Sequence, residues 1–274
     1  MLSATTPSNS THDKPRALVL RAAGTNCDRE TAAAFELAGA SASVLHINRL
    51  LEDPGQLHRF ELLSIAGGFS YGDDIASGRI FAERLAAVAD ELRQFINDGK
   101  PIIGICNGFQ VLVQAGLLPG EVPDFTGRTT ALTWNTSGVY QCRWVRLKKV
   151  SPHCVWTAGW DEGEVAELPI AHAEGRIMFA SPEAEQAVED AGRIAMTYDG
   201  NPNGSALDVA GLTDETGLVL GLMPHPERFI DPLQHPAWTR KKFDGDTNNN
   251  ATPAGLRLFQ SAVSHVVSHV VKTR

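Results

Sequence analysis

A cysteine in a glycine-flanked turn is the residue of this chain best suited to covalent chemistry. Cys106 lies in the segment G-I-C-N-G-F-Q (104–110), after the apolar run 101–103 and before a helical pattern at 111–117. A nucleophile between a strand and a helix, with glycines two residues away on each side, is typical of a nucleophile elbow. The helix N-terminus would point N–H groups at the sulfur and favour the thiolate, which attacks carbonyl carbon. Free cysteine is also commonly a small buried hydrophobe, and this motif alone leaves both interpretations open.

A second segment supplies the partners that a nucleophilic thiol needs. His225 and Glu227 lie in G-L-M-P-H-P-E-R (221–228), which follows the apolar run 217–222. The two prolines keep the chain extended around the histidine, so Glu227 is placed to orient the ring of His225. An isolated histidine in a proline-rich loop is more often an ordinary surface residue. Taken together with the cysteine motif, the segment predicts a triad in which Cys106 is the nucleophile, His225 the base and Glu227 the orienting group.

A glycine-rich loop after the third predicted strand is the candidate for an oxyanion hole. This loop reads G-G-F-S-Y-G-D (67–73). Backbone N–H groups near Gly68 and Phe69, together with that of Asn107, would stabilise the negative charge on a carbonyl oxygen, each by roughly 3 kcal/mol of barrier. A glycine pair after a strand also fits a plain turn. A phosphate-binding loop is the weaker alternative, because no G-K-[ST] follows.

The apolar pattern predicts strands alternating with helices. We expect strands at 16–21, 43–47, 62–66 and 101–105, and helices at 29–38, after Asp28 as N-cap, and at 80–97. This order predicts an α/β fold with a mostly parallel central sheet and helices on both faces. Ligands bind beyond the carboxyl ends of strands in such sheets, so Gly67, Cys106 and His225 are expected to line one cleft. β-Branched and aromatic residues at 134–146 predict antiparallel strands or a hairpin at the sheet edge, and 254–271 predicts a closing helix.

Composition and charge fit one globular domain. The chain has 274 residues, of which 43% are hydrophobic and 20% charged. The polar stretch 1–14 predicts a disordered tail and 240–253 an exposed insertion, with residues 15–274 forming the domain. A formal net charge of −8 argues against nucleic-acid binding. No apolar run approaches the roughly 18 residues of a transmembrane helix, so no membrane contact is expected.

The remaining cysteines and carboxylates predict no metal site. The cysteines show no C-x-x-C spacing; they are Cys27, Cys106, Cys142 and Cys154. A free thiolate at Cys106 fits a reducing, cytoplasmic compartment. Cys27 is interpreted as structural because no base accompanies it in the sequence, and the other two as packing residues. Asp73 and Asp74 are adjacent loop carboxylates without a third ligand nearby.

The two chemical motifs resemble those of class I (triad) glutamine amidotransferases. Within that class, G-G-F-S-Y-G-D, the turn G-T-N-C-D (24–28) and N-P-N-G-S (201–205) are similar to the glutaminase subunit of phosphoribosylformylglycinamidine (FGAM) synthase. The likeness covers about residues 16–230 in the same order. The chain departs from the family pattern at Ala173, usually a glycine, and at 22–24, where Ala-Ala-Gly replaces a Pro-Gly pair.

This resemblance implies a flavodoxin-like glutamine amidotransferase fold and a specific reaction. The Cys106 thiolate would attack the glutamine carboxamide and form a thioester, whose hydrolysis leaves glutamate and ammonia. The resemblance also implies that Gln110 contacts the substrate glutamine, and that the segment with His172 lines the glutamine pocket or meets the synthetase. From the sequence alone, Gln110 fits a partly exposed helix position nearly as well, and His172 fits an ordinary loop. Ammonia would pass to a large synthetase subunit, in a complex with a small bridging subunit, for the ATP-dependent conversion of formylglycinamide ribonucleotide in purine biosynthesis.

The chain itself is expected to need no cofactor. It contains no G-x-x-x-x-G-K-[ST] motif, so ATP and Mg²⁺ are expected on the synthetase partner. Two other interpretations stay open. One is a different cysteine hydrolase of the same fold, such as a γ-glutamyl hydrolase, which does not explain G-F-S-Y-G-D. The other is a non-catalytic regulatory subunit, against which the intact Cys, His and Glu argue.

Overall fold

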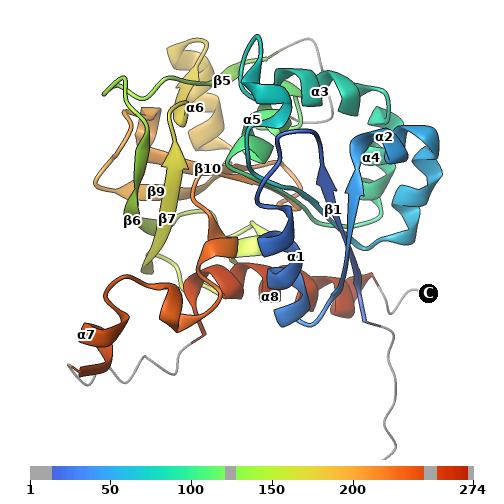
Figure 1. The fold of residues 1–274 in the computed structure, drawn as a ribbon. Coiled ribbons are helices and arrows are strands. Elements are labelled where there is room, and N and C mark those ends of the chain that lie inside the picture. Colours follow the sequence, from blue (N-terminus) through green and yellow to red (C-terminus); the bar gives the residue numbers. More distant parts are fainter. Residues whose placement is uncertain (1–13, 121–127, 244–251, 271–274) are drawn as a thin grey trace, which may run out of the picture.

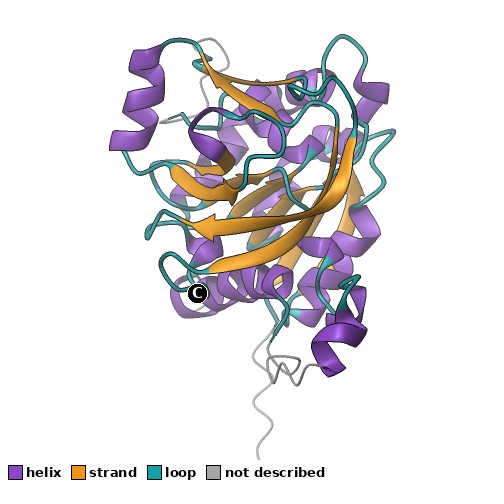
Figure 2. Ribbon diagram, turned by 90° about the vertical axis from the view of Figure 1, so that its left-hand side faces the viewer, coloured by secondary structure: helices purple, strands orange, loops and turns teal. Residues whose placement is uncertain are grey.

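A nine-stranded sheet runs through the centre of the molecule (Figure 1 and Figure 2). The computed structural model describes residues 14–120, 128–243 and 252–270. The strand order is β2 (Ser41–His46), β1 (Arg16–Arg21), β3 (Leu62–Ile65), β4 (Ile102–Ile105), β11 (Val219–Leu222), β10 (Val209–Thr213), β9 (Ile194–Asp199), β6 (Gln141–Lys149) and β7 (Val165–His172). Strands β5 (Thr130–Thr133) and β8 (Arg176–Phe179) form a separate antiparallel pair.

The sheet is parallel in one half and antiparallel in the other. Pairings from β2 through β1, β3 and β4 to β11 are parallel, whereas those from β11 through β10, β9 and β6 to β7 are antiparallel. The predicted α/β fold with its largely parallel core is thus confirmed, with an antiparallel extension. The predicted antiparallel pairing near 134–146 is confirmed for β6, whereas residues 134–140 form a loop.

Helices cover both faces of this sheet. Their bounds are α1 (Asp28–Leu37), α2 (Ile47–Glu52), α3 (Arg79–Ala86), α4 (Ala89–Asn97), α5 (Asn107–Gln114), α6 (Pro182–Asp190), α7 (Trp238–Phe243) and α8 (Ala254–His269). Helices α1 and α8 contact each other on one side, and α3 contacts α5 on the other (Figure 1). Short 3₁₀ helices lie between them; η1 (Pro54–Arg59), η2 (Ser70–Asp73) and η5 (Pro226–Arg228) matter below, and the others are η3 (Val155–Thr157), η4 (Ala206–Asp208) and η6 (Pro232–Gln234).

The central parallel strands are short, apolar and covered on both faces. Every residue of β3, β4 and β11 is buried, as are the four inner residues of β1. Such near-continuous apolar runs are what a parallel strand needs when helices cover both of its faces. Strand β4 pairs with β11 in a register that sets Ile105 opposite Leu222. The residues that follow these two strands therefore leave the sheet at the same edge.

Three sequence predictions differ from the structure. The single helix expected at 80–97 is broken into α3 and α4 around residues 87–88. Apolar residues continue at helical spacing across the break, but α3 packs on α5 whereas α4 packs on η1, so one straight helix would not reach both. The elbow helix starts directly after the nucleophile and spans Asn107–Gln114, so the helical segment expected to reach 117 ends three residues earlier. Part of the insertion expected at 240–253 belongs to α7.

The predicted N-terminal tail and the predicted insertion lie largely outside the described residues. The tail predicted at 1–14 is described only at Lys14, and residues 244–251 of the predicted insertion also lie outside. The closing helix is α8, which ends two residues earlier than predicted. Within the described ranges, none of the helices has the length and apolar character needed to cross a bilayer.

Candidate active site

Cys106 occupies a strained turn between β4 and α5. Its backbone angles are φ 51° and ψ −106°, a combination outside the regions that non-glycine residues ordinarily adopt. Such strain persists only where the surroundings hold it, and it concentrates at functional positions. The turn raises the side chain at the carboxyl edge of the sheet, directly before the first residue of the helix, as a nucleophile elbow requires.

The two glycines of the elbow are required by close packing. A Cβ at Gly104 would lie 2.5 Å from the carbonyl oxygen of Gly108. A Cβ at Gly108 would overlap the carbonyl oxygen of Ile65 in β3. The G-x-C-x-G spacing therefore follows from the approach of α5 to the ends of β3 and β4, in addition to the turn itself.

His225 and Glu227 form a buried, hydrogen-bonded pair. The ring Nδ1 of His225 lies 2.6 Å from Oε1 of Glu227, and both side chains are almost fully buried. The Nε2 atom has no hydrogen-bond partner among the described residues, so it is available to a reacting group. Burial lowers the pKa of His225, but the Glu227 carboxylate and the Cys106 sulfur outweigh it and hold the pKa well above its ordinary value. The arrangement therefore favours an imidazolium beside the Cys106 sulfur.

Cys106 and His225 meet beside Gly67. A Cβ at Gly67 would lie 3.3 Å from Cε1 of His225 and 3.5 Å from Cβ of Cys106. The Cys106 sulfur lies 3.7 Å from the carbonyl oxygen of Ala171. Residues that are 119 positions apart in the sequence (225 − 106) thus share one site at the carboxyl edge of the parallel strands.

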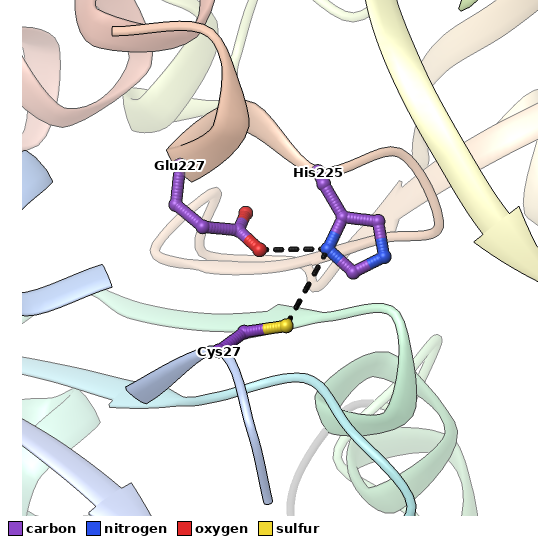
Figure 3. Close-up of side chains that lie close together, drawn as sticks. All are labelled: Cys27, His225 and Glu227. Carbon is purple, nitrogen blue, oxygen red and sulfur yellow. Dashed lines mark hydrogen bonds and ion pairs between the residues drawn. The ribbon is translucent and has the colours of Figure 1, made fainter. Parts of the chain in front are cut away.

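Cys27 is a residue of this site that the sequence interpretation missed. It was assigned a structural role because no base accompanies it in the sequence, but its sulfur lies 4.0 Å from Nδ1 of His225 (Figure 3). Arg228 donates a hydrogen bond to the same sulfur at 3.1 Å. Burial raises the pKa of the Cys27 thiol, so the group stays protonated near neutral pH. The sequence signal that could have placed Cys27 in the site is its position after β1, because β1 and β4 end at the same edge of the sheet. Cys142, expected to pack, is instead exposed.

The Cys27, His225 and Glu227 side chains could also be considered as metal ligands. One ligand atom from each lies within 4.8 Å of the others, the one such group found among the described residues. Two features oppose a cation there. The Arg228 guanidinium already contacts the sulfur, and the histidine nitrogen is committed to Glu227 at 2.6 Å. Metal chemistry would require both contacts to break, so the geometry fits an orienting pair better than a metal centre.

Of the predicted oxyanion donors, one N–H group already has an acceptor in the described part of the protein and two do not. The Phe69 N–H donates to the carbonyl oxygen of Gly24 at 3.0 Å, so the structure contradicts its assignment as an oxyanion donor. The reason is the packing of the 24–27 turn against the glycine-rich loop, where Thr25 and Gly68 form a bridge. Within the described residues, the N–H groups of Gly68 and Asn107 have no acceptor. These two remain the candidate donors.

Gln110 and His172 lie beside the site, but their contacts are with protein groups. Gln110 donates to the carbonyl oxygen of Glu174 at 2.7 Å and accepts from the Asn107 side chain at 3.0 Å. His172 is buried, and its Nδ1 lies 3.1 Å from Oδ1 of Asn135. Burial and the neighbouring His225 lower the pKa of His172 to about 4, so it is neutral at pH 7. Contact of either residue with the substrate stays a prediction.

Asn135 joins the loops beside the site, a role that its sequence did not reveal. Its side chain accepts from the Gly175 N–H at 3.2 Å and donates to the carbonyl oxygen of His172 at 2.9 Å. Asn203 then donates to the carbonyl oxygen of Gly175 at 2.8 Å. The N-P-N-G-S segment and the segment around His172 are therefore joined in one hydrogen-bond network.

Comparison with known proteins identifies the family. The CobB/CobQ-like glutamine amidotransferase domain matches residues 14–266. The phosphoribosylformylglycinamidine synthase subunit PurQ of Dehalococcoides mccartyi is 42% identical, over 91% of this chain and 97% of that protein. The chain belongs to the PurQ family of class I glutamine amidotransferases. The PurQ protein of Methanococcus maripaludis strain C5 is 40% identical over 92% of this chain and 98% of its own length.

Solved structures agree with this family membership. A chain in the structure of PurLQS from Thermotoga maritima is 33% identical, with a TM-score of 0.71 and coverage of 92% of this chain and 99% of that one. The glutaminase domain of Trypanosoma brucei CTPS with bound acivicin gives a TM-score of 0.56 at 16% identity, covering 91% of this chain and 94% of that one. At that identity the likeness shows a shared fold and nothing finer.

Proposed function

We propose that this PurQ family member, the glutaminase subunit of FGAM synthase in purine biosynthesis, hydrolyses glutamine at Cys106, His225 and Glu227. The observation that carries the assignment of residues is the meeting of Cys106 and His225 beside Gly67, with His225 bound to Glu227 at 2.6 Å. A nucleophile, a base and an orienting group recur in these roles in unrelated hydrolases, where geometry identifies them. Cys27 is the competing thiol, but it lies on the Nδ1 side of the ring, which Glu227 already occupies.

The reaction follows from the positions of these groups. The Cys106 thiolate attacks the side-chain carboxamide carbon of glutamine, and the N–H groups of Gly68 and Asn107 stabilise the resulting oxyanion. Protonated His225 gives its proton to the leaving nitrogen, so ammonia departs and a γ-glutamyl thioester remains. Neutral His225 then takes a proton from water as the water attacks the thioester. Glutamate leaves, and the thiolate–imidazolium pair is restored.

The ammonia is consumed on a partner. We place the ATP-dependent step, with its Mg²⁺, on a large synthetase subunit, because this chain carries no phosphate-binding G-x-x-x-x-G-K-[ST] segment. The Thermotoga maritima PurLQS structure supports an assembly with that subunit and a small bridging subunit. A cytoplasmic location suits a nucleophile that must stay a reduced thiol.

A glutamine analogue that alkylates thiols tests the assignment of the nucleophile. We expect one label per chain, on Cys106, found by mass spectrometry of peptides and prevented by excess glutamine. The Cys106→Ala variant should take no label and lose glutamine hydrolysis. Cys142→Ala removes an exposed thiol and should leave both labelling and hydrolysis unchanged. Labelling at Cys27, or none at all, would refute the proposal.

A further inference from the structure

The segment between β3 and α3 carries unusual backbone strain next to the nucleophile. Three of its non-glycine residues adopt positive φ: Tyr71 (55°), Asp73 (54°) and Ile75 (71°). Left-handed backbone is costly for such residues, most of all for the β-branched Ile75, and persists only where the surroundings impose it. The contacts of Asp73 identify what this segment holds in place.

Asp73 hydrogen-bonds to the side chain of Asn107, the first residue of α5. Oδ1 of Asp73 accepts a hydrogen bond from Nδ2 of Asn107 at 2.9 Å. The same amide nitrogen donates to Gln110 at 3.0 Å, while Oδ1 of Asn107 accepts from the Ser70 N–H at 3.1 Å. Asn107 is almost fully buried, and the loop holds its amide from both ends.

The hydrogen bonds to the Asn107 side chain restrain the peptide bond that bears the candidate oxyanion donor. The Asn107 N–H belongs to the Cys106–Asn107 peptide, whose plane is set by the strained ψ of Cys106, −106°. Strain favours rotation of that plane unless neighbouring contacts oppose it. An oxyanion donor works only when it is held in advance at the position that the developing charge will occupy. The carbonyl oxygen of that peptide accepts hydrogen bonds from the Phe109 and Gln110 N–H groups at 3.0 and 3.1 Å, and the buried side chain of Asn107 is a further anchor. Asp73 is the ionisable group that binds this side chain.

We propose that Asp73 is a positioning residue of the glutaminase reaction, which through Asn107 keeps the Asn107 N–H aimed at the oxyanion. This inference rests on the proposed function, because it presupposes hydrolysis at Cys106. Asp73 touches neither the thiol nor the ring of His225 in the contacts above, so it acts on the donor and not on the nucleophile or base.

Two substitutions at Asp73 separate the hydrogen bond from the backbone requirement. Asp73→Gly removes the carboxylate while tolerating positive φ, and Asp73→Asn keeps an oxygen that can accept from Asn107 and also tolerates this backbone. Ile75→Asn is the matched control: it changes another positive-φ residue of the same loop, whose side chain is 89% exposed. Asp73→Ala serves as a second truncation should the glycine variant fail to fold.

Glutamine hydrolysis and alkylation of Cys106 are measured in the assembled complex with the synthetase. For Asp73→Gly we expect kcat to fall about 10- to 100-fold with KM changed less than about threefold, since loss of a whole donor costs about 10²–10³. Asp73→Asn should recover to within about fivefold of the parent, and Ile75→Asn should match it. The rate of Cys106 alkylation by iodoacetamide, which needs a thiolate but no oxyanion hole, should not change in any variant.

Three results would overturn the inference: an unchanged kcat in Asp73→Gly, an alkylation rate that falls in parallel with kcat, or an equal loss of kcat in Ile75→Asn. The last two would assign the segment a general structural role. Persistent hydrolysis in Cys106→Ala would instead refute the proposed function, so the two failures are distinguishable.

Discussion

At the scale of single residues, the site is built from groups whose protonation depends on burial. Glu227 is fully buried against His225 and has no other role visible in its contacts. A carboxylate in this position orients the ring, selects its tautomer and stabilises the imidazolium. The pKa of His225 is raised chiefly by this neighbour, against the effect of burial. Loss of the charge should therefore harm proton transfer more than substrate binding.

Replacing Glu227 by Gln should lower kcat by about 10²–10⁴ with little change in KM, because the amide keeps the shape but neither the charge nor the tautomer preference. Steady-state kinetics of glutamine hydrolysis would measure this. Glu215→Gln, an exposed carboxylate, is the control and should behave as the parent. A Glu227→Gln variant with full kcat would show that the carboxylate is not needed for the reaction.

His172 predicts a pH dependence of folding stability. Its pKa is lowered to about 4 in the folded chain, against 6.5 ordinarily, so the unfolded chain binds more protons between these values. The free energy of unfolding should fall as the pH drops from about 6.5 towards 4, and this residue would contribute about 3 kcal/mol of that loss. His225 acts with the opposite sign, because its pKa is raised, and its stabilising effect is lost as the pH rises.

Urea unfolding of His172→Gln at several pH values isolates this contribution. The variant should lose less stability than the parent between pH 6.5 and pH 4, whereas the exposed His153→Gln should follow the parent curve. Identical slopes for the parent and His172→Gln would mean that His172 titrates normally in the folded protein.

At the scale of elements, the approach of α5 to β3 decides whether the elbow can exist. Gly108 is the contact point, because a Cβ there would overlap the carbonyl oxygen of Ile65. Backbone atoms have little freedom to move away in a buried strand, so the helix itself would have to shift. A shift of α5 would displace Cys106 and the Asn107 N–H together.

Gly108→Ala should therefore destabilise the fold by about 3 kcal/mol, the upper end of ordinary overpacking, and should also reduce glutaminase activity. Denaturant unfolding and a glutamine assay would measure the two effects. The control is Gly55→Ala, where a Cβ would meet only an Asp53 side-chain oxygen at 3.7 Å and the change should be within about 0.5 kcal/mol. Equal stability of the two variants would contradict the packing argument.

At the scale of the whole molecule, the proposed reaction releases ammonia, which the proposed synthetase partner would use. A free subunit with full activity would hydrolyse glutamine when no synthetase is present to use the ammonia. We expect the rate of glutamine hydrolysis to rise at least about tenfold when the synthetase and bridging subunits are added. The reason is that partners which bind the catalytically competent conformation of the site more tightly increase its population. Ammonia release before and after mixing measures this. Comparable rates for the free and the assembled chain would contradict the expectation.

Much of this fold and site was predictable because its signals are local. Apolar runs identified β1, β3, β4 and the α/β alternation, since burial on both faces requires continuous apolar residues. The glycines around Cys106 and the prolines around His225 indicated the turns that hold them, because these residue types restrict or free the backbone wherever they occur. Family motifs then named the reaction, since they preserve residue types at fixed spacing.

Only the tertiary structure decided which groups meet and where each hydrogen bond points. The sequence predicted the Phe69 N–H as an oxyanion donor, but the 24–27 turn captures it, and it placed Cys27 outside a site that Cys27 in fact borders. It also gave no sign that Asp73 holds Asn107. Each of these contacts joins segments that leave different strands at one sheet edge. Residue type and spacing determine what a segment can do, whereas the packing of distant segments determines which partner it finds.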